Sequence, residues 1–215
     1  MEELVFRTLS DQDEIEQFID RFGNFVGVQL PLPYVLANKV VGAFLQKRLV
    51  GGYIIVTKPP FRSTMFVPDS IKNTDKFFKL DPYDMMEVNG VWISPTLKTA
   101  KLQFSVWKNL LKAVFFSGKK YVLLMRNAKN KNVDHIHSLT NPTLLYMGTP
   151  SLIQGLSTHQ EISISFTTRW KLVRGFHSYW NEYKKREKRQ RRPIFSTPRI
   201  NTVVQEESSQ PEPIK

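Results

Sequence analysis

A strand, a turn, a helix and a second strand follow one another between Tyr83 and Met125, and this succession constrains the fold more than any other feature. The first strand is expected to end in Val91-Trp92-Ile93-Ser94-Pro95, and apolar residues at helical spacing predict a helix over 102–117. The apolar run 121–125 is typical of a buried strand. A helix that begins directly after a strand directs unpaired backbone N–H groups and a partial positive charge toward one point. The turn therefore predicts a phosphate-binding site.

The composition allows one core and narrows the class of protein. With 215 residues, 41 % hydrophobic and 12 % aromatic, the chain can bury one sizeable core, and we expect one domain followed by a tail. The absence of cysteine excludes disulfides, thiolate metal sites and cysteine nucleophiles, and it is compatible with the cytoplasmic location that we expect. We expect no signal peptide, because Met1-Glu2-Glu3-Leu4 lacks basic and apolar regions. No run of the sequence approaches the roughly 18 apolar residues of a membrane span.

The net charge of +12 is spread over the whole chain. Residues 184–215 hold 9 Lys or Arg against 4 Asp or Glu, so a basic excess also remains on the residues that precede them. A basic protein favours polyanionic partners, namely phosphate-rich cofactors, nucleic acid or an anionic membrane surface. The charge alone does not choose among these partners.

The rest of the chain continues the alternation of strands and helices. Upstream we expect a strand over 4–9, a helix to about 22, a short helix over 34–41, a hairpin of 41–45 with 49–57 bulged at Gly51-Gly52, and a polar loop or insertion over 58–82. Downstream we expect a helix over 133–139, a short strand or helix end over 144–147, a strand over 161–173, and a helix from Arg174 to about Arg192. The predicted fold class is α/β, with a mixed central sheet and flanking helices.

This order of elements resembles the GNAT superfamily of acyl-CoA-dependent N-acyltransferases, over roughly residues 3–173. Arg48-Leu49-Val50-Gly51-Gly52-Tyr53 is similar to the family's second hairpin, and residues 91–95 with Lys98 are similar to the strand, proline and basic turn before its cofactor-binding helix. Leu144-Leu145-Tyr146-Met147-Gly148 is similar to a Leu-Tyr pattern of the family, with Thr149 in place of its Phe. We therefore expect a GNAT-like domain over 1–173, a basic aromatic helix over 174–192 and a disordered tail over 193–215.

The resemblance implies an enzyme that moves an acyl group from acyl-CoA, or a related thioester, to an amine or another small nucleophile. It implies that Val91, Trp92 and Ile93 bind the pantetheine arm of the donor, and that Lys98, Thr99 and Lys101 bind its phosphates. The family's turn carries small residues where this chain has Lys101 and Gln103. We therefore expect lysine charges, more than backbone amides, to bind phosphate, the alternative being an ordinary basic helix start.

Two residues match the catalytic pattern of the family. Glu87, on the strand that leads to the turn, is the candidate base that takes the proton of the amine, and Tyr146 is the candidate acid for the departing thiolate. The alternatives are a solvated strand carboxylate for Glu87 and a packed core tyrosine for Tyr146. His135 and His137 are the remaining candidates as metal ligands, but residues two apart do not share a helix face, so we expect no metal site.

The terminal helix carries a separate signal. Its rings Phe176, Tyr179, Trp180 and Tyr183 form one stripe, followed by the basic run 184–192. Packing against the core is favoured, and the alternatives are nucleic-acid stacking and an interfacial membrane helix. The alternative function for the chain is therefore a non-catalytic GNAT-like module that binds nucleic acid, through 176–192, or a protein partner.

Overall fold

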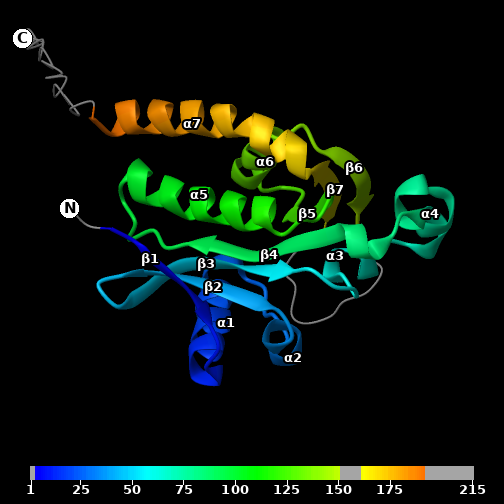
Figure 1. Ribbon diagram of the computed structural model, residues 1–215, viewed down its shortest axis with the longest axis horizontal. Coiled ribbons are helices and arrows are strands. Elements are labelled where there is room, and N and C mark those ends of the chain that lie inside the picture. The colour runs from blue at the N-terminus through cyan, green and yellow to red at the C-terminus, as the bar shows by residue number, and fades with distance from the viewer. Residues whose placement is uncertain (1–2, 151–160, 192–215) are drawn as a thin grey trace, which may run out of the picture.

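The computed structural model describes residues 3–150 and 161–191, which form a seven-stranded sheet with helices on both faces (Figure 1). The strand order is β1-β2-β3-β4-β5-β7-β6. Neighbouring strands are antiparallel except for the central pair β4 and β5, which is parallel. The predicted α/β class with a mixed sheet is confirmed.

The elements have the following bounds. The strands are β1 (Val5–Leu9), β2 (Lys39–Leu45), β3 (Arg48–Val56), β4 (Met85–Ile93), β5 (Tyr121–Asn127), β6 (Thr143–Gly148) and β7 (Ile162–Thr168). The helices are α1 (Gln12–Val26), α2 (Leu32–Leu36), α3 (Arg62–Met65), α4 (Asp69–Thr74), α5 (Ala100–Phe116), α6 (Lys131–Ser138) and α7 (Arg169–Arg191). Two 3₁₀ turns, η1 (Lys76–Lys79) and η2 (Pro82–Asp84), precede β4. In the described part of the chain, no helix has the length and apolarity of a membrane span.

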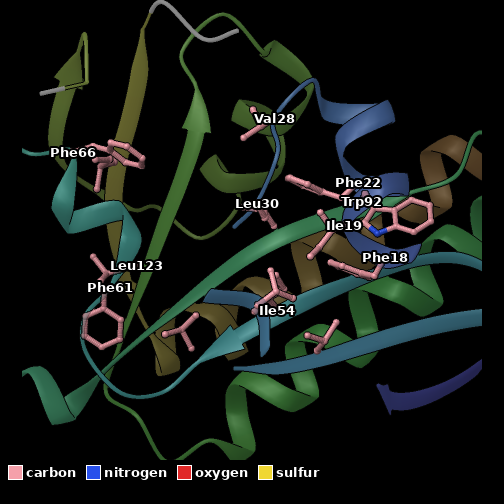
Figure 2. Packing of buried hydrophobic residues seen from close by; sticks show 14 of the residues in the cluster. Phe18, Ile19, Phe22, Val28, Leu30, Ile54, Phe61, Phe66, Trp92 and Leu123 are labelled. Carbon is pink, nitrogen blue, oxygen red and sulfur yellow. The ribbon is translucent and has the colours of Figure 1, made fainter. Parts of the chain in front are cut away.

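The two faces of the sheet are covered by different helices. Helix α1 packs against one face through Ile15, Phe18, Ile19 and Phe22, and Figure 2 shows these last three beside Trp92 of β4. Helices α5 and α7 cover the opposite face, where Leu110, Val114 and Leu172 contact Met86 and Val122 of the central strands. Alternate residues of β4 therefore face the α1 side and the α5 side.

The predicted hairpin is β2 with β3, and a register shift lies beside its two glycines, as predicted. Gly52 has φ +159°, and a Cβ there would meet the carbonyl oxygen of Val41 and the ring of Phe18. Gly52 pairs with Trp92, and Ile54 pairs with Asn89. Two β4 residues, Gly90 and Val91, therefore stand opposite one β3 residue, which makes a bulge in β4.

Three sequence predictions were wrong. The loop predicted over 58–82 instead contains α3, α4, η1 and the start of η2, because widely spaced phenylalanines (Phe61, Phe66, Phe77) are buried in the core without giving a readable period. The predicted strand over 161–173 ends at Thr168, because the helical spacing of Leu172, Phe176 and Tyr179 begins before Arg174. The helix predicted over 34–41 is the shorter α2, and Lys39 already begins β2. The predicted tail over 193–215 lies outside the described residues.

Candidate active site

The central strands separate halfway along their length. Registered pairs of β4 and β5 run from Met85 with Tyr121 to Val88 with Leu124, and the pairing then ends. Both strands continue, β4 to Ile93 and β5 to Asn127. Because the diverging ends no longer bond to each other, a wedge opens in the middle of the sheet, with backbone polar groups of both strands along its edges.

The wedge belongs to a cleft of about 1410 Å³ that reaches both faces of the sheet. On the α1 side its walls are apolar and include Phe22, Phe25, Val28 and Phe66, with Arg62 and Asn89 as polar groups. On the α5 side they come from α5, α6 and α7. The cleft can therefore admit one ligand from each face and let the two meet between β4 and β5.

Glu87 is fully buried on β4, on the α1 side of the sheet, so the alternative of a solvated strand carboxylate is wrong. Its Oε1 accepts hydrogen bonds from the Ser63 backbone N–H at 3.1 Å and from Asn89 Nδ2 at 3.3 Å. Its Oε2 has no hydrogen-bond partner among the described residues. Glu87 itself lies one layer behind the cleft, whose wall here is formed by Arg62 and Asn89.

Burial raises the pKa of Glu87 to about 7. The hydrogen bonds from the backbone of Ser63 and Arg62, and the nearby Arg62 charge, oppose this rise. Burial also lowers the pKa of the Arg62 guanidinium, and it raises the pKa of Tyr34, whose hydroxyl accepts a hydrogen bond from Asn89 at 3.1 Å. A carboxyl group with a pKa near neutrality can accept and release a proton at physiological pH.

The predicted pantetheine-binding segment lines the cleft. Val91, Trp92 and Ile93 all contribute to its wall, at the bulge in β4 and directly beyond it. The Trp92 ring stacks on Phe25 at 5.4 Å and contacts Phe18 edge-on at 6.1 Å. Its buried Nε1 has no hydrogen-bond acceptor among the described residues.

The predicted phosphate-binding residues stand where β4 turns into α5. Thr99 caps the helix, its hydroxyl accepting a hydrogen bond from the Leu102 backbone N–H at 3.3 Å. Over the described residues, the cleft lining includes Gln103 but not Lys98, Thr99 or Lys101. The Gln103 amide donates to the Leu97 carbonyl at 2.8 Å, so this side chain folds back onto the turn. The lysine roles stay a prediction.

Tyr146 lies on edge strand β6, half-buried, and its ring packs against the α1-side core. Its hydroxyl donates a hydrogen bond to the Thr149 carbonyl oxygen. Tyr146 is not part of the cleft wall, although Thr149 and Pro150 are. The structure therefore places Glu87 and Tyr146 on the same face of the sheet, on strands that are not neighbours.

Arg62, Ser63, Asn89 and Tyr34 were not identified from the sequence as functional residues. Arg62 and Ser63 come from α3, inside the segment predicted as a loop, and they reach Glu87 only through the fold. The one available signal was the polar pair Glu87 and Asn89, two apart on a strand and hence on one face.

The described residues contain no group of three side chains that could hold a metal ion. His137 and His135 lie on α6, and burial, with the charge of Arg126, lowers the pKa of His137 to about 4. His135 Nε2 instead lies 3.5 Å from a Glu182 carboxylate oxygen.

The aromatic stripe of α7 packs on the domain, as favoured by the sequence. Tyr179 is buried, and its hydroxyl donates to the Ile136 carbonyl at 3.2 Å. The rings of Phe176, Trp180 and Tyr183 all surround Phe104 of α5, at 6.1, 5.5 and 4.9 Å. These rings are occupied by protein contacts, so nucleic acid would have to displace them in order to stack.

The chain resembles solved structures of acyltransferases. The sequence itself matches no protein-family profile and no curated protein. FeeM, an N-acyl amino acid synthase from uncultured soil microbes, shares 13 % identity over 81 % of this chain and 96 % of its own, with a TM-score of 0.60. Arabidopsis thaliana NAA60 in complex with acetyl-CoA shares 10 % identity over 77 % and 98 %, with a TM-score of 0.54.

A third structure is the GNAT-family acetyltransferase from Streptococcus pneumoniae, at 10 % identity over 77 % of this chain and 99 % of its own, with a TM-score of 0.51. At such identities the likeness defines the fold. The chain has the GNAT fold, as the order of its elements predicted.

Proposed function

We propose that the protein transfers an acyl group from acyl-CoA, or a related phosphopantetheine thioester, to an amine or another small nucleophile. The observation that carries this proposal is the wedge between β4 and β5, which opens through the sheet beside a buried carboxylate. The solved structure of NAA60, which has the same fold and holds acetyl-CoA, supports acyl-CoA as the co-substrate. A cytoplasmic location is part of this proposal.

The donor enters from the α5 side. Backbone groups of Val91, Trp92 and Ile93, freed by the divergence of the strands, bond to its pantetheine arm. The acceptor enters from the α1 side, between apolar walls and beside Arg62 and Asn89. Direct transfer is then the simplest reaction, because the two ligands meet in one cleft and can react without a covalent enzyme intermediate.

In the reaction, the amine nitrogen attacks the thioester carbonyl carbon. The C–N bond forms and the C–S bond breaks, so the acyl group leaves the thiol for the amine. The proton lost by the amine passes through one water molecule to Glu87 Oε2, the carboxylate oxygen that has no partner among the described residues. The departing thiolate takes a proton from Tyr146, once its hydroxyl leaves the Thr149 carbonyl.

The direct test is an assay with purified protein, a series of acyl-CoAs of increasing chain length and a panel of amines that includes amino acids. Release of free CoA thiol and the mass of the N-acylated product are measured together. We expect turnover with at least one donor and acceptor pair. If no CoA or acyl-carrier thioester is bound or turned over, the enzymatic function is excluded.

A first prediction concerns the turn before α5. Replacing both Lys98 and Lys101 by Ala is expected to weaken acyl-CoA binding about tenfold. Each substitution removes one positive charge from the end of the helix where the phosphates are expected. Calorimetric titration measures the change. Lys108→Ala with Lys112→Ala, which removes the same charge further along α5, is the control and should leave the affinity unchanged.

A further inference from the structure

The basic end of α7 lies at the start of α5. Phe115, near the C-terminal end of α5, contacts Trp170 at the beginning of α7, whereas Phe104, near its N-terminal end, contacts Tyr183. The two helices are therefore antiparallel, as Figure 1 also shows. The basic run that follows Tyr183 is thereby brought to the N-terminal end of α5, where the helix dipole is positive.

The rise per residue of a helix shows how far the end of α7 overlaps the beginning of α5. Arg189 lies roughly 9 Å beyond Tyr183 along the axis of α7, whereas Ala100 lies roughly 6 Å before Phe104 on α5, at 1.5 Å per residue. Because Tyr183 stacks on Phe104, the last described turn of α7 reaches the first turn of α5 and the β4–α5 connection. A ligand at this connection would meet both helices.

The cleft wall includes cations from this end of α7. Lys185, Arg186 and Arg189 line it, together with Glu182 of the same helix. Arg186 Nε donates a hydrogen bond to a Glu182 carboxylate oxygen at 3.0 Å, so the positive charge of Arg186 is offset by the negative charge of Glu182. Lys185 and Arg189 are exposed, and they bring two further positive charges to the cleft. From the beginning of α5, Gln103 also lines the cleft, and its amide donates a hydrogen bond to the Leu97 carbonyl.

We propose that Lys185 and Arg189 bind the phosphates of the acyl donor, so that the terminal helix supplies part of the anion site expected at the turn. This inference rests on the proposed function, because it takes a CoA-type thioester as the ligand. The shared chemistry is a phosphorylated pantetheine arm whose acyl end lies between β4 and β5 and whose phosphates lie between α5 and α7. Such contacts position the donor and take no part in the bond exchange.

The test compares two double variants of the full chain. Lys185→Ala with Arg189→Ala removes the cleft-lining pair. Lys184→Ala with Lys188→Ala removes the same net charge from the same helix, at positions outside the cleft lining of the described residues. Calorimetry measures the affinity for CoA, and kinetics give KM for acyl-CoA and for the same acyl group on pantetheine, which has no phosphate. Melting temperatures show whether either variant is unfolded.

We expect the first variant to weaken CoA binding and to raise KM for acyl-CoA about tenfold, leaving KM for acyl-pantetheine unchanged. The second should leave all three values unchanged. Equal weakening in both variants, or an equal loss with acyl-pantetheine, would overturn the inference. CoA binding that depends on Lys185 and Arg189 without turnover would retain the phosphate site and refute the enzyme. Turnover of acyl-pantetheine that added CoA does not inhibit would retain the enzyme and refute the phosphate site.

Discussion

Glu87→Gln is expected to lower kcat by roughly 100- to 10,000-fold, the usual contribution of a general base. Glutamine keeps the size of the side chain and an oxygen that accepts the Ser63 backbone hydrogen bond, but it cannot take the proton of the amine. The measurement is steady-state turnover with the donor and acceptor found in the assay. KM for acyl-CoA should change little, because Glu87 faces the α1 side, away from the expected donor.

The pH dependence checks the same role. Because burial raises the pKa of Glu87 to about 7, the base is protonated below that pH, and kcat/KM should fall as pH drops through 7. In the glutamine variant this dependence should disappear. A variant that keeps the full rate and the same pH profile would show that Glu87 is only the counter-charge of Arg62, and that the base lies elsewhere.

The melting temperature of the Glu87→Gln variant shows whether a loss of activity comes from loss of the base or from unfolding. The folded protein holds the Glu87 proton up to a pH of about 7, whereas the unfolded chain releases it near pH 4.5. The folded state therefore binds more protons between these values, and the contribution of Glu87 to stability falls as pH rises through that window. Glutamine has no such dependence, so the variant should melt at or above the wild-type temperature at pH 8.

The order of strands and helices could be predicted because each element carries its own signal. The run 121–125 is apolar because β5 is covered on both faces, and the spacing of Val106, Leu110 and Val114 follows the face of α5 that meets the sheet. The resemblance to the GNAT fold follows from this order. The short helices between β3 and β4 gave no such signal, since a helix of one turn has no measurable period.

The site was harder to predict, because its members meet only in three dimensions. Glu87 could be identified from its position on the strand before the turn, but its burial comes from α3, whose Ser63 lies 24 residues earlier in the sequence. Arg62 and Asn89 likewise form the cleft wall through the packing of α3 on the α1 side. No local pattern around Lys185 or Arg189 shows that α7 runs back along α5, since that direction follows from contacts between distant rings, Phe115 with Trp170 and Phe104 with Tyr183.

Tyr179→Ala is expected to lower the free energy of unfolding by about 3–4 kcal/mol, the range for emptying a buried aromatic site. Tyr179 is 7 % exposed and joins α7 to α6 through its hydrogen bond to the Ile136 carbonyl. Trp180 belongs to the same aromatic stripe, but this residue is 37 % exposed, so Trp180→Ala should cost less, about 1–2 kcal/mol. Chemical denaturation of both variants measures the difference.

Tyr179→Phe isolates the hydrogen bond from the packing of the ring. It should cost about 1 kcal/mol, because the ring stays in place and only the contact to Ile136 is lost. If the stripe were instead a nucleic-acid surface, Tyr179→Ala would leave stability unchanged and would weaken a salt-sensitive RNA or DNA affinity by about 1–3 kcal/mol. A loss of stability without any nucleic-acid binding would establish α7 as part of the folded body that carries the basic wall of the cleft.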